Sequence, residues 1–526
     1  MDTPVPVGGR PMLVVQKSDL TVTARSLCMI IAASGRILGR GVPVRVDPGT
    51  GGSLPRVARL SVEGVILLAH ELASVVMMKD DNALPVTLPD RVAKLYLAIG
   101  DWGLRPLKGI TGAPLLAADG GIRSVNGYDP QSGLWCANVP EMSVPPHPSC
   151  ADAEAALLDI RRAFQTFPFA DAPLLQMGPR QLVDISKPAG ADETAFLVGL
   201  LSAACRSSLP LVPGLLIKAP NFSGAGTGKG LLARSICAIA FGSPPYAMTS
   251  SGKADELEKR IVAALIEARP VLFLDNVNRG LPRSDILASI LTEQHVSVRP
   301  LGVSQSLSLT PNTLVLVTGN GISLTEDLAR RFLVCELDAK MEDPEQRPFE
   351  PGFLDAITAR RAELLSALLT IWRWARQNEA SLTRGRPLGS FELWRGWVRD
   401  PLLTLGCADP VARIGANKAN DPHRLRIIAI FATWWSAHGA TPVSASQLAE
   451  PVCEVIDELG KGRQFVASQL AGMEGTRAAG FVLVRQRMGK WSADIYALRK
   501  VEDEPRPTTD PPPNPMTPMT PMPQGG

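Results

Sequence analysis

The sequence predicts an α/β fold built on a doubly wound parallel sheet, and three observations favour it. Between residues 190 and 340, apolar strand patterns alternate with amphipathic helix patterns. A glycine-rich turn separates the first of these strands from the helix that follows, and two later strands end in polar residues. The chain has 526 residues, of which 45% are hydrophobic and 20% charged. This is more apolar side chain than one hydrophobic core needs. We therefore expect further domains around this sheet.

Composition divides the chain into five segments. Residues 1–150 mix short apolar runs with Gly/Pro turns, which predicts an α+β domain whose role stays open. Residues 151–345 contain the alternation of strands and helices, and residues 346–415 have helical patterns. Residues 416–501 combine helices with two strands. The tail, 502–526, is Pro-rich and has too little apolar surface to offset the entropy of ordering, so we expect it to be disordered.

Charge and apolar content exclude several classes of protein. Lys and Arg number 54 and Asp and Glu 51, giving a net charge of +3, which excludes a histone-like polycation and a disordered acidic chain. The N-terminus lacks a signal-peptide pattern, and the longest apolar stretch, Val62–Met78, contains Glu63 and Glu71, so we expect no membrane span. The eight Cys are scattered, and His147 with Cys150 makes a poor zinc site. Buried thiols in the reducing cytoplasm are the expectation.

A strand, a Gly-rich turn and a helix pattern follow one another from Leu215 onward. Glycines allow the backbone to curl so that several N–H groups face one point, and the helix adds its positive N-terminal end. This arrangement predicts a phosphate-binding P-loop. An ordinary Gly-rich turn with a solvated lysine is the alternative. The residues expected to bind the nucleotide are Ser223, Gly224, Ala225, Gly226, Thr227, Gly228, Lys229, Gly230 and Leu231.

Lys229 is expected to reach the β- and γ-phosphates as a point charge. The turn departs from the pattern GxxxxGK[ST] at two positions, because its first Gly is replaced by Ser223 and the hydroxyl residue after the lysine by Gly230. Glycine has no hydroxyl to offer to magnesium. The metal ion must therefore depend on other oxygens or on water.

The apolar strand Val271–Asn276 places an acid, Asp275, at its end. A carboxylate at that position can hold the hydration shell of magnesium, whereas capping of the next turn is the alternative. Asn276 occupies the position at which many P-loop ATPases have a Glu that orients the attacking water. Because Asn cannot take a proton, the identity of the general base stays open.

Two further polar groups follow the next strands. The buried strand Thr313–Thr318 leads to Asn320, whose amide is expected to position water against the γ-phosphate. Arg330 and Arg331 then precede the strand Leu333–Leu337. An arginine at this point is commonly an arginine finger, which reaches the nucleotide site of a neighbouring subunit. The alternative is that Arg330 and Arg331 are ordinary surface charges.

The segments Leu215–Gly230, Val271–Val277, Val315–Asn320 and Asp327–Phe332, in this order, resemble those of AAA+ ATPases. They are most similar to the helicase-type ATPases of phages, plasmids and integrated elements, akin to superfamily 3 helicases and the helicase part of primase-helicases. The resemblance extends to residues 106–114, 127–129, 390–394 and 406–410.

This resemblance implies an AAA+ P-loop fold, a hexameric ring and translocation on single-stranded or forked DNA. It also implies ATP with Mg²⁺ as cofactors, with Asp275 at the metal. Host replication proteins are further candidate partners.

Three regions are candidates for contact with nucleic acid. Residues 295–309 alternate apolar and polar side chains around a Pro-Leu-Gly turn, which predicts a hairpin with Arg299 as the phosphate contact. An ordinary hairpin with a solvated arginine is the alternative. The Trp-rich segment offers base-stacking platforms or, alternatively, core packing. Its tryptophans are Trp372, Trp374, Trp394 and Trp397.

The third region is basic, since residues 384–500 carry 16 Lys or Arg against 10 Asp or Glu. Helices beginning at His423, within residues 444–450 and within residues 454–459 precede two strands, 480–485 and 494–498. Three helices and a β-wing indicate a winged-helix domain, which docks on duplex DNA. A winged helix that contacts protein is the alternative. The candidate phosphate contacts at the wing are Arg485, Arg487 and Lys490.

The sequence therefore predicts an ATP-hydrolysing, ring-forming DNA helicase or replication ATPase from a mobile genetic element. A nucleotide-gated DNA-binding initiator with weak hydrolysis is the second hypothesis, motivated by Gly230 and Asn276. An AAA+ motor that acts on a protein target is the third.

Overall fold

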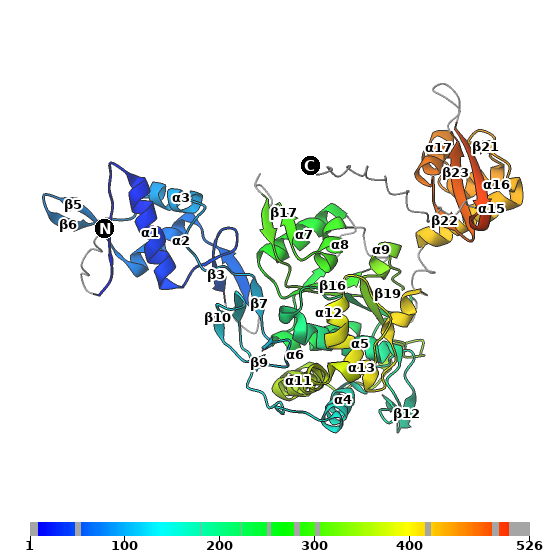
Figure 1. Cartoon of the computed structure of the whole chain (residues 1–526), viewed down its shortest axis with the longest axis horizontal. Coiled ribbons are helices and arrows are strands. Elements are labelled where there is room, and N and C mark those ends of the chain that lie inside the picture. Colours follow the sequence, from blue (N-terminus) through cyan, green and yellow to red (C-terminus); the bar gives the residue numbers. More distant parts are fainter. Residues whose placement is uncertain are drawn as a thin grey trace, which may run out of the picture. The chain divides into compact units, whose positions relative to one another are not determined.

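The computed structural model describes residues 9–47, 54–178, 180–221, 224–249, 254–277, 284–299, 306–415, 422–486 and 494–503. The chain forms two compact units, residues 1–418 and residues 419–526 (Figure 1). The predicted tail lies almost entirely outside the described residues. The two units are described separately below.

A five-stranded parallel sheet is the centre of the first unit, and it confirms the predicted parallel sheet. Its order is β15-β16-β19-β14-β20, so β14 lies between β19 and β20 although it precedes both in the chain. Ligands of such sheets bind at the carboxyl end of a strand where the connections diverge, and β14 is that strand here. The strands are β14 (Gly214–Ala219), β15 (Ala247–Thr249), β16 (Val271–Val277), β19 (Leu314–Asn320) and β20 (Phe332–Glu336).

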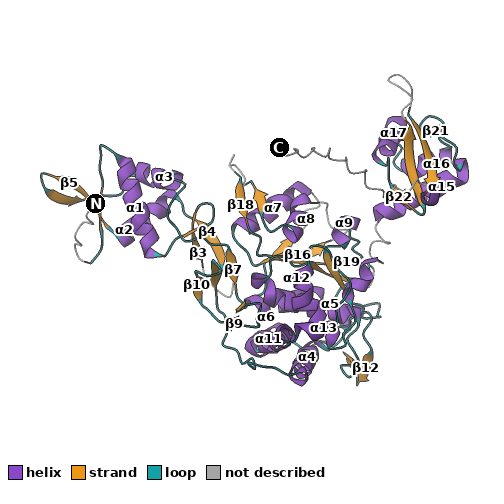
Figure 2. Cartoon of the chain, viewed as in Figure 1, coloured by secondary structure: helices purple, strands orange, loops and turns teal. Residues whose placement is uncertain are grey.

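Helices cover both faces of this sheet, as a doubly wound fold requires (Figure 2). In β14, Leu215 and Ile217 belong to the core on the side of α5 and α6, whereas Leu216 belongs to the core on the side of α7 and α8. Burial on both faces explains why the strands are continuous apolar runs without alternation. The helices are α5 (Ala191–Cys205), α6 (Lys229–Phe241), α7 (Ala254–Ile266) and α8 (Asp285–Thr292).

The N-terminal part of the first unit combines three helices with short strands. The helices are α1 (Leu20–Ser34), α2 (Val62–Leu72) and α3 (Asp90–Ala98), which share one buried core with β1 and β5. The strands are β1 (Met12–Val14), β2 (Leu38–Gly39), β3 (Pro43–Asp47), β4 (Arg56–Arg59), β5 (Ser74–Lys79), β6 (Asn82–Pro85), β7 (Gly109–Thr111), β8 (Leu115–Leu116), β9 (Ile122–Arg123), β10 (Gly127–Asp129) and β11 (Leu134–Cys136).

One arginine joins this N-terminal part to the P-loop helix. Arg361 donates hydrogen bonds to the carbonyl of Ile239, at the end of α6, at 3.0 Å, and to the carbonyls of Gly112 at 2.7 Å and Asn138 at 2.6 Å. At Gly112 a Cβ atom would lie 2.6 Å from the carbonyl oxygen of Phe241, so only glycine allows this approach. The segment around β7 is therefore packed directly on the last turn of α6.

Helices and short turns follow the sheet as far as residue 413. Four tryptophans of this part, predicted either to stack on bases or to pack in the core, are between 0% and 5% exposed, and they form part of the core. The elements are α10 (Phe353–Ala359), α11 (Arg361–Gln377), α12 (Glu392–Trp394), the π-helical turn Arg395–Arg399 and α13 (Asp400–Thr404). α11 packs against α4 (Cys150–Phe164).

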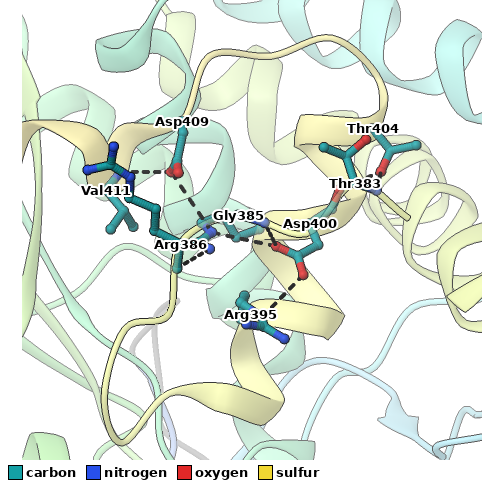
Figure 3. Close-up of polar contacts among 9 residues, drawn as sticks. Thr383, Gly385, Arg386, Arg395, Asp400, Thr404, Asp409 and Val411 are labelled. Atoms are coloured by element: carbon teal, nitrogen blue, oxygen red, sulfur yellow. Dashed lines mark hydrogen bonds and ion pairs between the residues drawn. The ribbon is translucent and has the colours of Figure 1, made fainter. Parts of the chain in front are cut away.

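An ion-pair network fixes the π-helical turn (Figure 3). Asp400 accepts a hydrogen bond from the N–H of Gly385 at 3.1 Å and pairs with Nε of Arg395 at 3.3 Å. The Arg399 side chain is 0% exposed, and its Nε lies 3.7 Å from Asp400 and 3.9 Å from Asp409. Because Gly385 and Asp409 lie on either side of the segment Arg395–Asp400 in the chain, the network joins both to this segment.

The remaining elements of the first unit lie beside or between those above. They are β12 (Leu174–Met177), β13 (Arg180–Val183), η1 (Arg206–Ser208), β17 (Val296–Val298), β18 (Leu307–Leu309), α9 (Glu326–Ala329), η2 (Pro344–Gln346), η3 (Glu379–Ser381) and η5 (Pro410–Arg413). β17 and β18 pair in antiparallel fashion, with Val296 opposite Leu309, as the predicted hairpin requires. The turn of this hairpin, residues 300–305, lies outside the described residues.

The second unit contains helices packed with an antiparallel sheet of order β21-β24-β23-β22. The two predicted wing strands are present as β23 and β24, paired from Phe481–Lys500 to Gln486–Ile495. The elements are α15 (Pro422–His438), β21 (Val443–Ser444), α16 (Glu450–Ile456), α17 (Arg463–Gly472), β22 (Arg477–Ala478), β23 (Phe481–Gln486), β24 (Ile495–Lys500) and η6 (Val501–Asp503).

The predicted helix at residues 444–450 was wrong, and the one at 454–459 was misplaced. Pro451 lies in the first turn of α16, and proline is tolerated only there because it has no N–H to donate. A helix therefore cannot run through it from Ser444. Asp457 ends α16 by accepting hydrogen bonds from the N–H groups of Lys461 and Gly462.

Membrane-spanning helices and disulfides were not expected. Within the described residues, no helix is long and apolar enough to cross a bilayer. The eight cysteines are free, and six are buried, as the sequence predicted for most of them.

Candidate nucleotide-binding site

The Gly-rich turn lies at the carboxyl end of β14 and leads into the first turn of α6, as the sequence predicted. Gly226 and Gly228 have φ angles of 72° and 95°, in the left-handed region that glycine adopts without strain. Among the described residues, no side chain caps the N-terminus of α6. Its first N–H groups are therefore available to an anion, and the helix dipole favours negative charge at this end. Ser223 lies outside the described residues.

Lys229 folds back over the turn. Its Nζ donates hydrogen bonds to the carbonyl of Gly224 and to Oγ1 of Thr227, which is 3.2 Å away. Thr227 in turn donates to the Gly224 carbonyl at 3.0 Å. Burial lowers the pKa of Lys229, and the negative charge of Asp275 opposes that shift. A partly desolvated ammonium group at the mouth of a helix N-terminus is suited to bind a phosphate.

Asp275 is held in place by a threonine of the neighbouring strand. Thr318, 1% exposed, donates a 2.6 Å hydrogen bond to Oδ1 of Asp275 and accepts one of 3.0 Å from the N–H of Asn276. From the sequence, Thr318 is expected only as part of a strand. Its role depends on the pairing of β16 with β19, which no local pattern reveals.

A bulge shapes the end of β16. The register with β19 shifts between Leu274 and Val277, and Asn276 has a φ of 53°. Asparagine tolerates this left-handed conformation better than glutamate, which gives a structural reason for the Asn at this position. At Gly319 a Cβ atom would lie 2.2 Å from the carbonyl oxygen of Val277, so the bulge also requires glycine there.

Asn320 lies beside the P-loop. It is opposite Ala219 in the β14–β19 pairing, and its Oδ1 lies 2.6 Å from where a Cβ atom of Gly224 would be. That oxygen is buried, and it has no hydrogen-bond partner among the residues that the structure describes. A buried polar atom without a partner carries a desolvation cost, which a bound water or ligand would remove.

The residues present do not fit a magnesium ion bound in the usual way. Gly230 offers no hydroxyl, and both oxygens of Asp275 already have partners, because Nη2 of Arg234 lies 2.9 Å from Oδ2. Among the described residues there is no cluster of three or more His, Cys, Asp or Glu side chains that would hold a metal ion. The guanidinium of Arg234 therefore competes with a metal ion for Oδ2 of Asp275.

The two candidate finger arginines have different surroundings. The Arg330 side chain is 58% exposed and pairs with Asp327 at 2.6 Å. The Arg331 side chain is 13% exposed, and it donates a 2.6 Å hydrogen bond to the carbonyl of Ala288 in α8 as well as pairing with Asp327. Arg331 is therefore fixed within its own subunit, whereas Arg330 is accessible.

Two segments that the sequence analysis did not assign cover the turn. The backbone of Glu345 approaches Gly226 so closely that a Cβ atom there would lie 2.6 Å away. Phe167, 1% exposed, packs beside Gly228 and against the ring of Phe353, with 5.4 Å between the ring centroids. Neither has a sequence signal, because both reach the turn from distant parts of the chain.

The candidate DNA contacts are only partly described. Arg299 is exposed at the end of β17. Arg485, predicted to contact phosphate, pairs with Glu474 at 3.3 Å and with Asp494, and its side chain is 17% exposed. Its contact with phosphate stays a prediction, in which DNA would compete with these two carboxylates. Arg487 and Lys490 lie outside the described residues.

Thr318→Val is expected to reduce both stability and nucleotide turnover. Valine keeps the shape but removes both hydrogen bonds, so unfolding should cost about 1–3 kcal/mol less and turnover should fall about tenfold as Asp275 loses its orientation. Denaturant unfolding and a phosphate-release assay measure the two effects. Thr370→Val is the matched control, because this buried threonine bonds only to Ser366 of its own helix. Equal turnover in both variants would contradict the role of Thr318.

Comparison with known proteins gives structural neighbours only. No protein-family model and no curated protein matches the chain. The apo A form of the NrS-1 C-terminal region is 11% identical, with a TM-score of 0.35, over 90% of this chain and 98% of that one. SCCmec type IV Cch, described as an active helicase, is 10% identical, with a TM-score of 0.33, over 88% of this chain and 91% of that one.

JCV helicase, crystallised with a small molecule, is 15% identical, with a TM-score of 0.20, over 43% of this chain and 66% of that one. Two of these three proteins are helicases by their descriptions, the class that the sequence motifs resemble. At such TM-scores the matches assign no residue. The roles of individual side chains depend on the geometry of this chain.

Proposed function

We propose that the chain is an ATP-dependent DNA helicase or replication ATPase that works as a ring. The observation that carries this proposal is the arrangement of three groups at the carboxyl ends of neighbouring parallel strands. Lys229 begins α6 after the turn that follows β14, Asp275 lies two residues before the end of β16, and Asn320 ends β19. A phosphate-binding turn, a carboxylate and a polar amide at one sheet edge are the groups that phosphoryl transfer to water needs.

Each group has a proposed role. Lys229 and the N–H groups of the turn bind the phosphates, and Asn320 binds the attacking water, since its buried oxygen has no partner in the described part of the chain. ATP is the proposed nucleotide, and Mg²⁺ is the proposed cofactor of its turnover. Asp275 stays the candidate carboxylate for that ion, subject to the Arg234 contact described above.

We assign the finger to Arg330, because Arg331 is bound to α8 of its own subunit. Arg330→Ala should reduce turnover in the assembled protein by about tenfold or more and leave the stability of the subunit unchanged. Arg331→Ala should instead destabilise the fold by about 1–3 kcal/mol, since it removes a buried hydrogen bond. Phosphate release and thermal unfolding of both variants test the assignment. Lost turnover in a stable Arg331→Ala variant, with normal turnover in Arg330→Ala, would reverse it.

A second function is favoured by two observations at the same site. Asn276 cannot act as a base and Gly230 cannot ligate a metal, and both suit a chain that binds nucleotide but hydrolyses it weakly. Such a protein would be a nucleotide-gated DNA-binding initiator or regulator. In that case assembly on DNA, and not turnover, would depend on ATP.

DNA contact is proposed through the β17–β18 hairpin with Arg299 and through the second unit. The helices and antiparallel strands of that unit support a winged-helix interpretation. Arg487 and Lys490 stay candidate phosphate contacts there. The mobile-element origin and the host replication partners are expectations from the resemblance alone.

Strand displacement on forked DNA in the presence of ATP tests the proposed function. Unwinding that Lys229→Ala abolishes supports the helicase. DNA-stimulated assembly without unwinding supports the initiator. Indifference of both turnover and assembly to DNA would contradict both and favour a motor that acts on a protein target.

A further inference from the structure

Arg234 occupies the space that a side chain at position 230 would need. A Cβ atom at Gly230 would lie 2.6 Å from Nη1 of Arg234 and 3.6 Å from Oδ1 of Asp275. Position 230 therefore faces the carboxylate, as the hydroxyl residue of the usual motif would, but the guanidinium fills the space in between. The glycine after the lysine and the arginine four residues later are thus linked sterically.

Helix geometry explains how Arg234 reaches this position. Residues four apart lie on the same face of a helix, and long side chains on helices point back toward the N-terminus. From α6 the Arg234 side chain therefore extends toward the first turn, where the phosphates of a nucleotide are proposed to bind. The ring of Phe273 supports it from β16, with 5.4 Å between Cζ and the ring centroid.

The charge of the guanidinium has one described carboxylate partner, Asp275, at 2.9 Å. The Arg234 side chain is 35% exposed, so it borders the open side of the site. Arginine presents five N–H donors in a planar fork that suits phosphate oxygens as well as carboxylates. One guanidinium can therefore contact Asp275 and a phosphate at the same time.

We propose that Arg234, beside Asp275, takes the place of the metal ion that the hydroxyl residue of the usual motif binds. Because its guanidinium supplies the positive charge, a nucleoside triphosphate binds this P-loop without a divalent cation. This inference rests on the proposed nucleotide site and concerns binding, not turnover. It also explains why position 230 is a glycine, because a larger side chain there would collide with the guanidinium of Arg234.

Binding of ATP to the full chain, measured by calorimetry with Mg²⁺ and with excess EDTA, tests the proposal. The wild-type affinity should differ by less than about threefold between the two conditions, whereas Arg234→Ala should lose about tenfold or more in EDTA. The double variant Gly230→Thr/Arg234→Ala should recover affinity only with Mg²⁺, because it restores a hydroxyl beside Asp275. Arg162→Ala, which removes an exposed arginine from α4, is the control and should behave as wild type.

Two results would overturn the proposal in distinguishable ways. If EDTA weakens wild-type binding by about 100-fold and Arg234→Ala behaves identically, the inference fails and the nucleotide site stands. If no variant binds ATP in either condition, the proposed function fails together with the inference. Thermal unfolding of each variant shows whether a loss of affinity reflects a loss of fold.

Discussion

Lys229→Ala is expected to reduce nucleotide turnover by about 1,000-fold, because the variant loses an ammonium group that lies on the proposed phosphate-binding turn. The contacts of Lys229 in the nucleotide-free chain are to Gly224 and Thr227 of the same turn. Burial lowers the pKa of the lysine, so its charge is already costly to maintain, and its removal should leave the fold intact. Phosphate release and thermal unfolding measure the two effects.

Lys259→Ala provides the control for this variant. Lys259 lies on α7 with its side chain 52% exposed, and its partner is Glu256 of the same helix. Its removal should change neither turnover nor binding. Normal turnover in Lys229→Ala would contradict the nucleotide site as a whole.

Arg161→Met is expected to lower the free energy of unfolding by about 3–5 kcal/mol, the largest stability change that the structure indicates. Nε and Nη2 of Arg161 donate to the two carboxylate oxygens of Glu193 at 2.7 and 3.0 Å, and both side chains are at most 4% exposed. Nη1 donates to the carbonyls of Ile185 and Lys187. The variant leaves Glu193 charged and buried without a partner, which is the costly state.

The double variant Arg161→Met/Glu193→Leu separates the pair from simple packing. Since replacing both ions by apolar side chains is often nearly neutral, most of the lost stability should return. Arg162→Ala, one residue away on the exposed face, should change stability by less than about 1 kcal/mol. A double variant as unstable as the single one would show that the hydrogen bonds to the two carbonyls, and not the buried charge, determine the effect.

The sheet was predictable because its strands are buried on both faces. Leu215–Lys218, Val271–Asn276, Thr313–Thr318 and Leu333–Leu337 were expected as strands, and all four lie within or overlap strands of the parallel sheet. β15 was not expected, since a three-residue edge strand has little pattern of its own. In the second unit, Pro451 and Asp457, and not the spacing of apolar residues, mark the two ends of α16.

The site residues that a sequence motif marks were predictable, whereas those that reach the site only through tertiary contacts were not. Lys229 follows the Gly-rich turn after β14, whereas Asp275 and Asn320 lie in the last residues of β16 and β19, and the structure brings those strands together. Thr318 and Arg234 act on Asp275 from a different strand and a different helix, so their contacts appear only once the sheet is assembled. The left-handed backbone of Asn276 likewise depends on the bulge against β19.

The two ends of α6 have different partners, and this has a mechanical consequence. Its first turn belongs to the phosphate-binding turn, and its last turn is bonded through Arg361 to Gly112 and Asn138. The helix has 13 residues and is therefore a stiff rod about 20 Å long. A displacement of its N-terminus is therefore expected to reach the segments at Gly112 and Asn138, which Arg361 bonds to its last turn. If phosphates that bind or leave at the proposed nucleotide site move this end, we expect those segments of the first 150 residues to respond.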